Sequence, residues 1–117
     1  MENPPFPMES PHRPVMVREV IHWLDPKPGE IFMDATLGFG GHAEMIAECI
    51  SPDGMLIGLD VDPAAIDYCQ KKSPGWSCRV CLVRAGYEDA GLIVRELGIE
   101  RIDGILVDLG ILVTEIQ

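Results

Sequence analysis

The chain has 117 residues, of which 47% are hydrophobic, and its 19 acidic against nine basic residues give a formal net charge of −10. This length suits one small domain, and the negative charge favours solubility while opposing non-specific attraction to nucleic acid. No apolar run reaches the roughly 18 residues of a membrane helix, and the first residues lack the features of a secretory signal, so we expect a globular cytoplasmic protein with no membrane contact.

Residues 1–13 carry four of the ten prolines and little apolar periodicity, so we predict a flexible arm there and a single domain over residues 14–117. The segment "VMVREVIHWL" then predicts an amphipathic helix, which "DPKPG" ends. The apolar face of that helix consists of Val17, Val20, Ile21 and Leu24.

Beyond residue 30, short apolar runs alternate with segments of helical periodicity. The predicted strands are 31–35, 55–60, 79–83 and 103–110, and the predicted helices are 42–50, 63–72 and 88–97. Continuous apolar strands separated by helices are typical of a parallel sheet covered on both faces. The predicted fold class is therefore α/β, with a doubly wound parallel sheet.

The four cysteines are Cys49, Cys69, Cys78 and Cys81, and only the last two form a C-x-x-C pattern. A spacing of three on a strand points two side chains to opposite faces, and no second pair completes a tetrahedral zinc set. We therefore expect no metal site, and thiols that stay reduced in a reducing compartment.

Polar residues follow the predicted strands, at the edge where parallel sheets bind ligands. Asp34, Asp60 and Asp108 end the first, second and fourth strands, and Tyr87 follows the third after a short loop. Tyr87 is either a stacking partner for an adenine ring or a half-buried packing residue. Asp108 lies either at the mouth of a site or at a solvated strand end.

The stretch "DATLGFGGH", residues 34–42, places glycines between a strand and a helix N-terminus. Gly38 and Gly40 let the backbone approach a ligand closely, although such glycines can also simply end a strand. Asp60, about twenty positions further on, can accept the hydroxyl protons of a ribose. Capping of the next helix is the alternative role for Asp60 and the expected role for Asp62.

Asp34 and His42 flank the glycines. Asp34 is either an acceptor that organises the loop through backbone N–H groups or a contact to a cationic ligand. His42 lies in the first turn of a helix, where the positive end of the dipole lowers its pKa, so we expect a loop hydrogen bond from it rather than catalysis.

Two cofactors compete for this loop. Gly38, Gly40 and Ala43 followed by Asp60 fit the dinucleotide pattern G-x-G-x-x-G/A, so an NAD(P)-binding domain of an oxidoreductase is one alternative. Carboxylates at Asp34 and Asp108 would repel a pyrophosphate but attract a sulfonium or ammonium group. S-adenosylmethionine therefore fits better, with its ribose on Asp60, its adenine near Tyr87 and its methionine end by the glycine loop.

Three separated segments carry a more specific signal: "HRPVMVREVIHWLDPKPGEIFMDATLGFGGHAEMI", "GLDVDPAAI" and "DGILVDLG". They resemble the N-terminal portion of the MraW-type methyltransferases, which methylate the N4 amine of a cytosine in bacterial small-subunit ribosomal RNA. The resemblance covers residues 12 to about 110 and implies a Rossmann-like class I methyltransferase sheet in the order 3-2-1-4. The S-adenosylmethionine contacts that it implies are Gly40, Gly41, His42, Asp60, Tyr87 (usually Phe in the family) and Asp108.

Two departures from the family pattern follow the fourth strand. Leu112 and Val113 stand where the family has serines, and Glu115 stands where it has a glutamine that contacts the cofactor. Family members run more than twice as far, so we expect an incomplete methyltransferase domain with its fourth strand as an open edge. Such an edge predicts partial instability, self-association or completion by another chain, and a non-catalytic interaction fragment is a further alternative.

The expected chemistry is an in-line transfer of a methyl group to an amine, in which positioning supplies most of the acceleration. Asp108 is the one candidate to accept a hydrogen bond and later the proton from the amine. The target base has to leave the stack, and the sequence shows no obvious basic stripe to hold its RNA.

Overall fold

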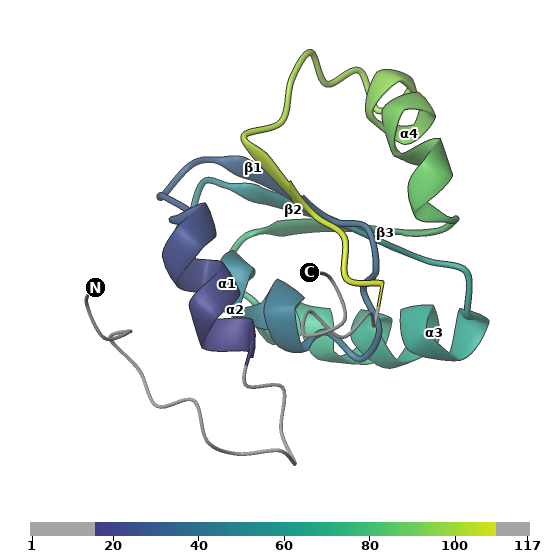
Figure 1. Ribbon diagram of the computed structural model, residues 1–117, viewed down its shortest axis with the longest axis horizontal. Coiled ribbons are helices and arrows are strands. Elements are labelled where there is room, and N and C mark those ends of the chain that lie inside the picture. Colours follow the sequence, from purple (N-terminus) through teal and green to yellow (C-terminus); the bar gives the residue numbers. More distant parts are fainter. Residues whose placement is uncertain (1–15, 110–117) are drawn as a thin grey trace, which may run out of the picture.

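The computed structural model describes residues 16–109, which form a four-stranded parallel sheet with helices on both faces (Figure 1). The predicted arm at residues 1–13 lies outside the described residues, as do Leu112, Val113 and Glu115. No helix within residues 16–109 is both long enough and apolar enough to cross a membrane.

The strands are β1 (Ile31–Asp34), β2 (Met55–Asp60), β3 (Arg79–Arg84) and β4 (Gly104–Leu106). Their order is β3-β2-β1-β4 and every neighbouring pair is parallel, which confirms the predicted order. Because all four strands run in one direction, their carboxyl ends meet at one edge of the sheet.

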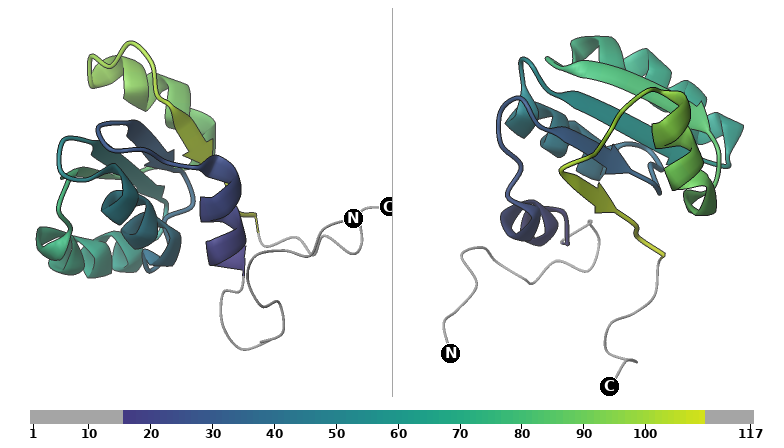
Figure 2. Two further views of the ribbon diagram at one scale, coloured as in Figure 1. Left: turned by 90° about the vertical axis from the view of Figure 1, so that its left-hand side faces the viewer. Right: turned by 90° about the horizontal axis from the view of Figure 1, so that it is seen from above.

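Three helices cover one face of the sheet and a single helix covers the other (Figures 1 and 2). The first face carries α1 (Met16–Leu24), α2 (Gly41–Ile50) and α3 (Pro63–Lys72), and the second carries α4 (Ala90–Glu96). Side chains alternate along each strand, so Phe32 and Leu56 pack against the first group while Met33 and Ile57 pack on the α4 side. The doubly wound α/β prediction is confirmed.

The C-x-x-C cysteines lie on opposite faces, as the spacing predicted. Cys78 packs on the core that includes Leu56, whereas Cys81 pairs in register with Ile57, a residue of the opposite core. All four cysteines are free thiols. Within residues 16–109 no group of three or more His, Cys, Asp or Glu side chains is placed to hold a metal ion.

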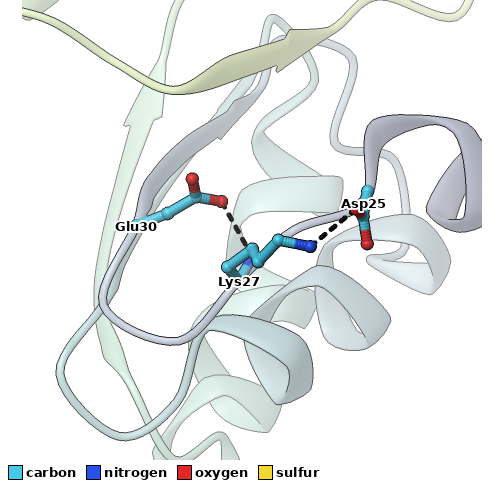
Figure 3. A network of polar contacts seen from close by, with 3 residues as sticks. All are labelled: Asp25, Lys27 and Glu30. Atoms are coloured by element: carbon cyan, nitrogen blue, oxygen red, sulfur yellow. Dashed lines mark hydrogen bonds and ion pairs between the residues drawn. The ribbon is translucent and has the colours of Figure 1, made fainter.

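A short polar turn ends α1 and leads into β1 (Figure 3). Asp25 takes the left-handed conformation at φ 50°, and its N–H donates to Ile21 at the close of the helix. The Lys27 backbone N–H donates to Glu30 Oε1 (2.8 Å), and its Nζ pairs with Asp25 Oδ2 (2.6 Å). These exposed contacts fix the direction of the chain rather than adding much stability.

Two predicted elements differ from the observed ones by more than one residue at an end. The strand predicted at 103–110 spans only Gly104–Leu106, because the Asp108 N–H donates to the Thr36 side chain (Oγ1, 2.7 Å) and the chain leaves the ladder. The helix predicted at 88–97 begins later, after a 3₁₀ turn at Tyr87–Asp89 in which the Asp89 N–H bonds to the carbonyl three residues before it.

Among the described residues, β4 has a single sheet neighbour, β1. Ile105, Val107 and Leu109 are exposed along this segment. The predicted open edge is therefore present in the described part of the chain, and self-association through it stays a prediction.

A substitution of Gly54, which leads into β2, tests how closely the backbone packs at the start of that strand. A Cβ atom there would lie 2.5 Å from the Ile50 carbonyl oxygen and 2.6 Å from that of Glu30. Both are backbone atoms, so we expect Gly54→Ala to lower the free energy of unfolding by about 2 kcal/mol in urea titrations.

Gly91 in α4 is the matched control, because nothing lies within 4 Å of a Cβ atom at that position. Gly91→Ala should raise the free energy of unfolding by about 0.5 to 1 kcal/mol, since alanine is the better helix former. Equal effects of the two substitutions would contradict this account of the packing.

Candidate functional site at the carboxyl ends of the strands

The loop between β1 and α2 depends on two left-handed glycines. Gly38 has φ 55° and Gly40 has φ 85°, and the Gly40 N–H donates to the Leu37 carbonyl (3.0 Å) before α2 begins at Gly41. A Cβ atom on Gly40 would lie 3.0 Å from the Cys69 sulfur. The loop is therefore held close over α3, in a conformation that side chains other than glycine rarely adopt.

Asp60 connects this loop to the end of β2. Its Oδ2 accepts the Gly38 N–H (2.8 Å), and its Oδ1 accepts the Asp62 N–H (2.9 Å). Asp62 itself caps α3 by accepting the Ala64 N–H (2.9 Å), which confirms the role expected of it. The Asp60 carboxylate thus organises both loops, and each of its oxygens keeps a lone pair for a further donor.

Asp34 is the buried acid of the site, with 1% of its surface exposed. Its Oδ1 accepts the Thr36 N–H (3.1 Å), which confirms that it organises the loop, and its Oδ2 has no hydrogen-bond partner within the described residues. Burial raises the pKa of Asp34 to about 6, against the effect of the Thr36 hydrogen bond. Coulombic repulsion from Asp108 and Asp60 adds to the increase.

A cleft of about 310 Å3 opens where the ends of β1, β2 and β4 meet the segment after β3. Three residues that the sequence singled out, Asp60, Tyr87 and Asp108, line it together, and Tyr87 is 47% exposed. The other lining residues are Ala35, Thr36, Val61, Ala85, Gly86, Glu88 and Leu109. A cleft of this size with a few convergent polar groups is typical of a small-molecule site.

Gly40, Gly41 and His42 lie at the start of α2 and are not among the residues that line this cleft. Burial lowers the pKa of His42, while the negative charge of Asp108 opposes that shift. The direction expected for His42 is confirmed, although burial rather than the helix dipole is its largest cause. The contacts implied for these three residues stay predictions.

Thr36 and Glu88 also line the site, although the sequence pattern did not predict them. The Thr36 hydroxyl accepts the Asp108 N–H and so joins the ends of β1 and β4, while Glu88 adds a further carboxylate to the cleft. A hydroxyl residue two positions after the strand-end Asp34 was the available signal for Thr36. No local signal identified Glu88, because its place depends on the turn after β3.

The fold is similar to that of several solved structures. An rRNA methylase from Streptococcus thermophilus superposes with a TM-score of 0.65 at 22% sequence identity, covering 87% of this chain and 58% of that one. Trm5b from Pyrococcus abyssi gives a TM-score of 0.60 at 18% identity, covering 80% of this chain and 26% of that one. These likenesses establish the Rossmann-like fold.

Sequence comparison finds much closer relatives. The chain is 43% identical over 104 residues to the ribosomal RNA small subunit methyltransferase H of Geobacter sulfurreducens, covering 89% of this chain and 33% of the relative. The protein of the same name from Thermotoga neapolitana is 48% identical over 100 residues, covering 86% and 33%. The chain spans about a third of the length of these relatives.

The model of the MraW methylase family matches residues 9–117, which include every described residue. This match agrees with the relatives and with the fold. The chain therefore belongs to the MraW methylase family.

Proposed function

We propose that this chain is the cofactor-binding part of an S-adenosylmethionine-dependent methyltransferase that acts on the N4 amine of a cytosine in small-subunit ribosomal RNA, in the cytoplasm. The observation that carries the proposal is the cleft at the strand ends, where Asp60, Tyr87 and Asp108 converge beside the glycine loop. The names of the relatives support the substrate class.

The residues of the cleft suit the parts of the methyl donor. Asp60, already oriented by two backbone N–H groups, would accept the ribose hydroxyls. The exposed ring of Tyr87 would stack on the adenine. The glycine loop and the start of α2, including Gly40, Gly41 and His42, would hold the methionine end.

The negative charge of the site favours S-adenosylmethionine over the nicotinamide dinucleotide of the alternative function. Asp60, Asp108 and Glu88 line the cleft. Asp34 is buried and directly precedes Ala35 and Thr36, two other residues that line the cleft. Four carboxyl groups at one edge attract the sulfonium and ammonium groups of S-adenosylmethionine, whereas they repel a pyrophosphate. The family assignment supports the same choice.

The bound cofactor would supply an electrophilic methyl group for transfer to the cytosine amine. The residues of this chain would contribute positioning. Asp108, at the mouth of the cleft, would accept a hydrogen bond from the amine and then take up the proton that the amine loses.

Asp60→Asn tests the proposal by calorimetric titration with S-adenosylhomocysteine, the more stable product. The amide cannot accept from two backbone N–H groups and two ribose hydroxyls as a carboxylate does, so we expect the affinity to fall by about ten-fold or more. Asp67→Asn is the matched control, because Asp67 is an exposed acid on α3 that pairs with Lys71 (3.3 Å).

Unchanged affinity of a folded Asp60→Asn variant would overturn the ribose assignment. Binding of NADH in place of S-adenosylhomocysteine would favour the oxidoreductase alternative. An apparent molecular mass that rises with protein concentration in sedimentation, without affinity for either ligand, would favour an interaction fragment that pairs through β4.

The raised pKa of Asp34 predicts a pH dependence. A cationic ligand favours the ionised carboxylate, which predominates above the pKa of about 6, so cation binding weakens as the pH falls through that value. S-adenosylmethionine carries one more positive charge than S-adenosylhomocysteine. The affinity for S-adenosylmethionine, divided by that for S-adenosylhomocysteine, should therefore decrease as the pH is lowered from 7 to 5. In the Asp34→Asn variant this ratio should depend less on pH.

The unliganded protein gives an independent measure of the same pKa. Between about pH 4 and pH 6 the Asp34 carboxyl keeps its proton in the folded state but has lost it in the unfolded state. The contribution of Asp34 to the free energy of unfolding therefore decreases as the pH rises through this range, by at most about 3 kcal/mol. The difference in unfolding free energy between Asp34→Asn and the parent should change over that range. A constant difference would contradict the raised pKa.

A further inference from the structure

An exposed aromatic pair lies beside the glycine loop. Phe39, between Gly38 and Gly40, meets Tyr68 of α3 edge to face, with ring centroids 5.1 Å apart and an interplanar angle of 84°. Phe39 is 64% exposed and Tyr68 is 44% exposed. Neither residue belongs to the buried hydrophobic core, and neither lines the cleft.

A lysine completes this cluster. Lys72, one helical turn beyond Tyr68, places its Nζ 5.3 Å from the centroid of the Tyr68 ring. The same Nζ lies 3.4 Å from Glu44 Oε1 of α2, which helps to hold it there. Two aromatic rings and a cation therefore converge from the loop and α3 on one side of the glycine loop.

We propose that Phe39, Tyr68 and Lys72 form a stacking site for an unpaired base of single-stranded RNA next to the base that is methylated. This inference rests on the proposed function, since methyl transfer to a ring amine requires the target base to leave its stack. The aromatic pair would hold a neighbouring base, and Lys72 would lie close to the backbone of that nucleotide.

The charge of the chain favours stacking over phosphate binding as the mode of contact. A net charge of −10 opposes attraction of the phosphate backbone, whereas stacking on an aromatic ring requires no net positive charge. The edge-to-face contact with Tyr68 limits the freedom of the Phe39 ring, so less freedom is lost when a base stacks on it. Phe39 directly follows Gly38, which binds Asp60, so this site adjoins the proposed cofactor cleft.

The test is the affinity of the full chain for a fluorescein-labelled, seven-nucleotide single-stranded RNA with a central cytosine, at fixed salt and with saturating S-adenosylhomocysteine. Phe39→Ala and Tyr68→Ala should each weaken RNA binding by about ten-fold. Phe39→Trp and Tyr68→Phe keep the rings and should restore binding to within about two-fold of the parent, an outcome that a general loss of folding would not produce.

Trp23→Ala is the matched control, because Trp23 is a 78% exposed aromatic residue on α1, away from the glycine loop. It should leave RNA affinity unchanged. The same RNA in a duplex should bind more weakly, since pairing hides the faces of its bases. The proposal is overturned if the parent does not bind the single strand, if duplex and single strand bind equally, or if the alanine variants bind like the parent.

Titration of S-adenosylhomocysteine alone separates this inference from the proposed function. The Tyr68→Ala variant should bind it with the affinity of the parent, because Tyr68 lies on α3 and belongs neither to the cleft nor to the glycine loop. If the parent itself fails to bind it, the proposed function falls, while the RNA affinities still decide the stacking site. If the parent binds it but RNA binding does not depend on the rings, only the stacking site falls.

Discussion

The arrangement of the site depends on the two hydrogen bonds that the Asp60 carboxylate accepts. One comes from Gly38 and the other from Asp62, so a single side chain at the end of β2 fixes the glycine loop and the start of α3 together. The left-handed glycines allow the loop to follow this path, and a Cβ atom on Gly40 would lie only 3.0 Å from the Cys69 sulfur. The ligand cleft lies where these constraints meet.

The parallel sheet explains why the site is acidic. Asp34 and Asp60 end β1 and β2, and Asp108 follows β4 by two residues, so the parallel topology brings the three acids to one edge although they are far apart in the sequence. Their mutual repulsion and the burial of Asp34 disfavour full ionisation of the three acids. A cationic ligand relieves that cost, and this relief links the fold to the proposed choice of cofactor.

The element order could be predicted from the sequence, because apolar periodicity is a property of local segments. The strand order followed from the motifs that resemble the family. The sequence also identified Asp60, Tyr87 and Asp108, since residues at strand ends can be read from the pattern. The early end of β4 could not be predicted, because it follows from a hydrogen bond between Thr36 and Asp108, 72 positions apart. The cause of the His42 shift was missed for a similar reason, as burial is a tertiary property.

The proposed function requires that the cleft at the strand ends binds a methyl donor. Backbone amide chemical shifts recorded while S-adenosylhomocysteine is added would test it most directly, with NADH as the comparison ligand. With S-adenosylhomocysteine we expect shifts concentrated at residues 34–42, 60–62, 85–88 and 106–109, and with NADH we expect none there. Shifts at these residues with NADH alone, or shifts elsewhere with S-adenosylhomocysteine, would contradict it.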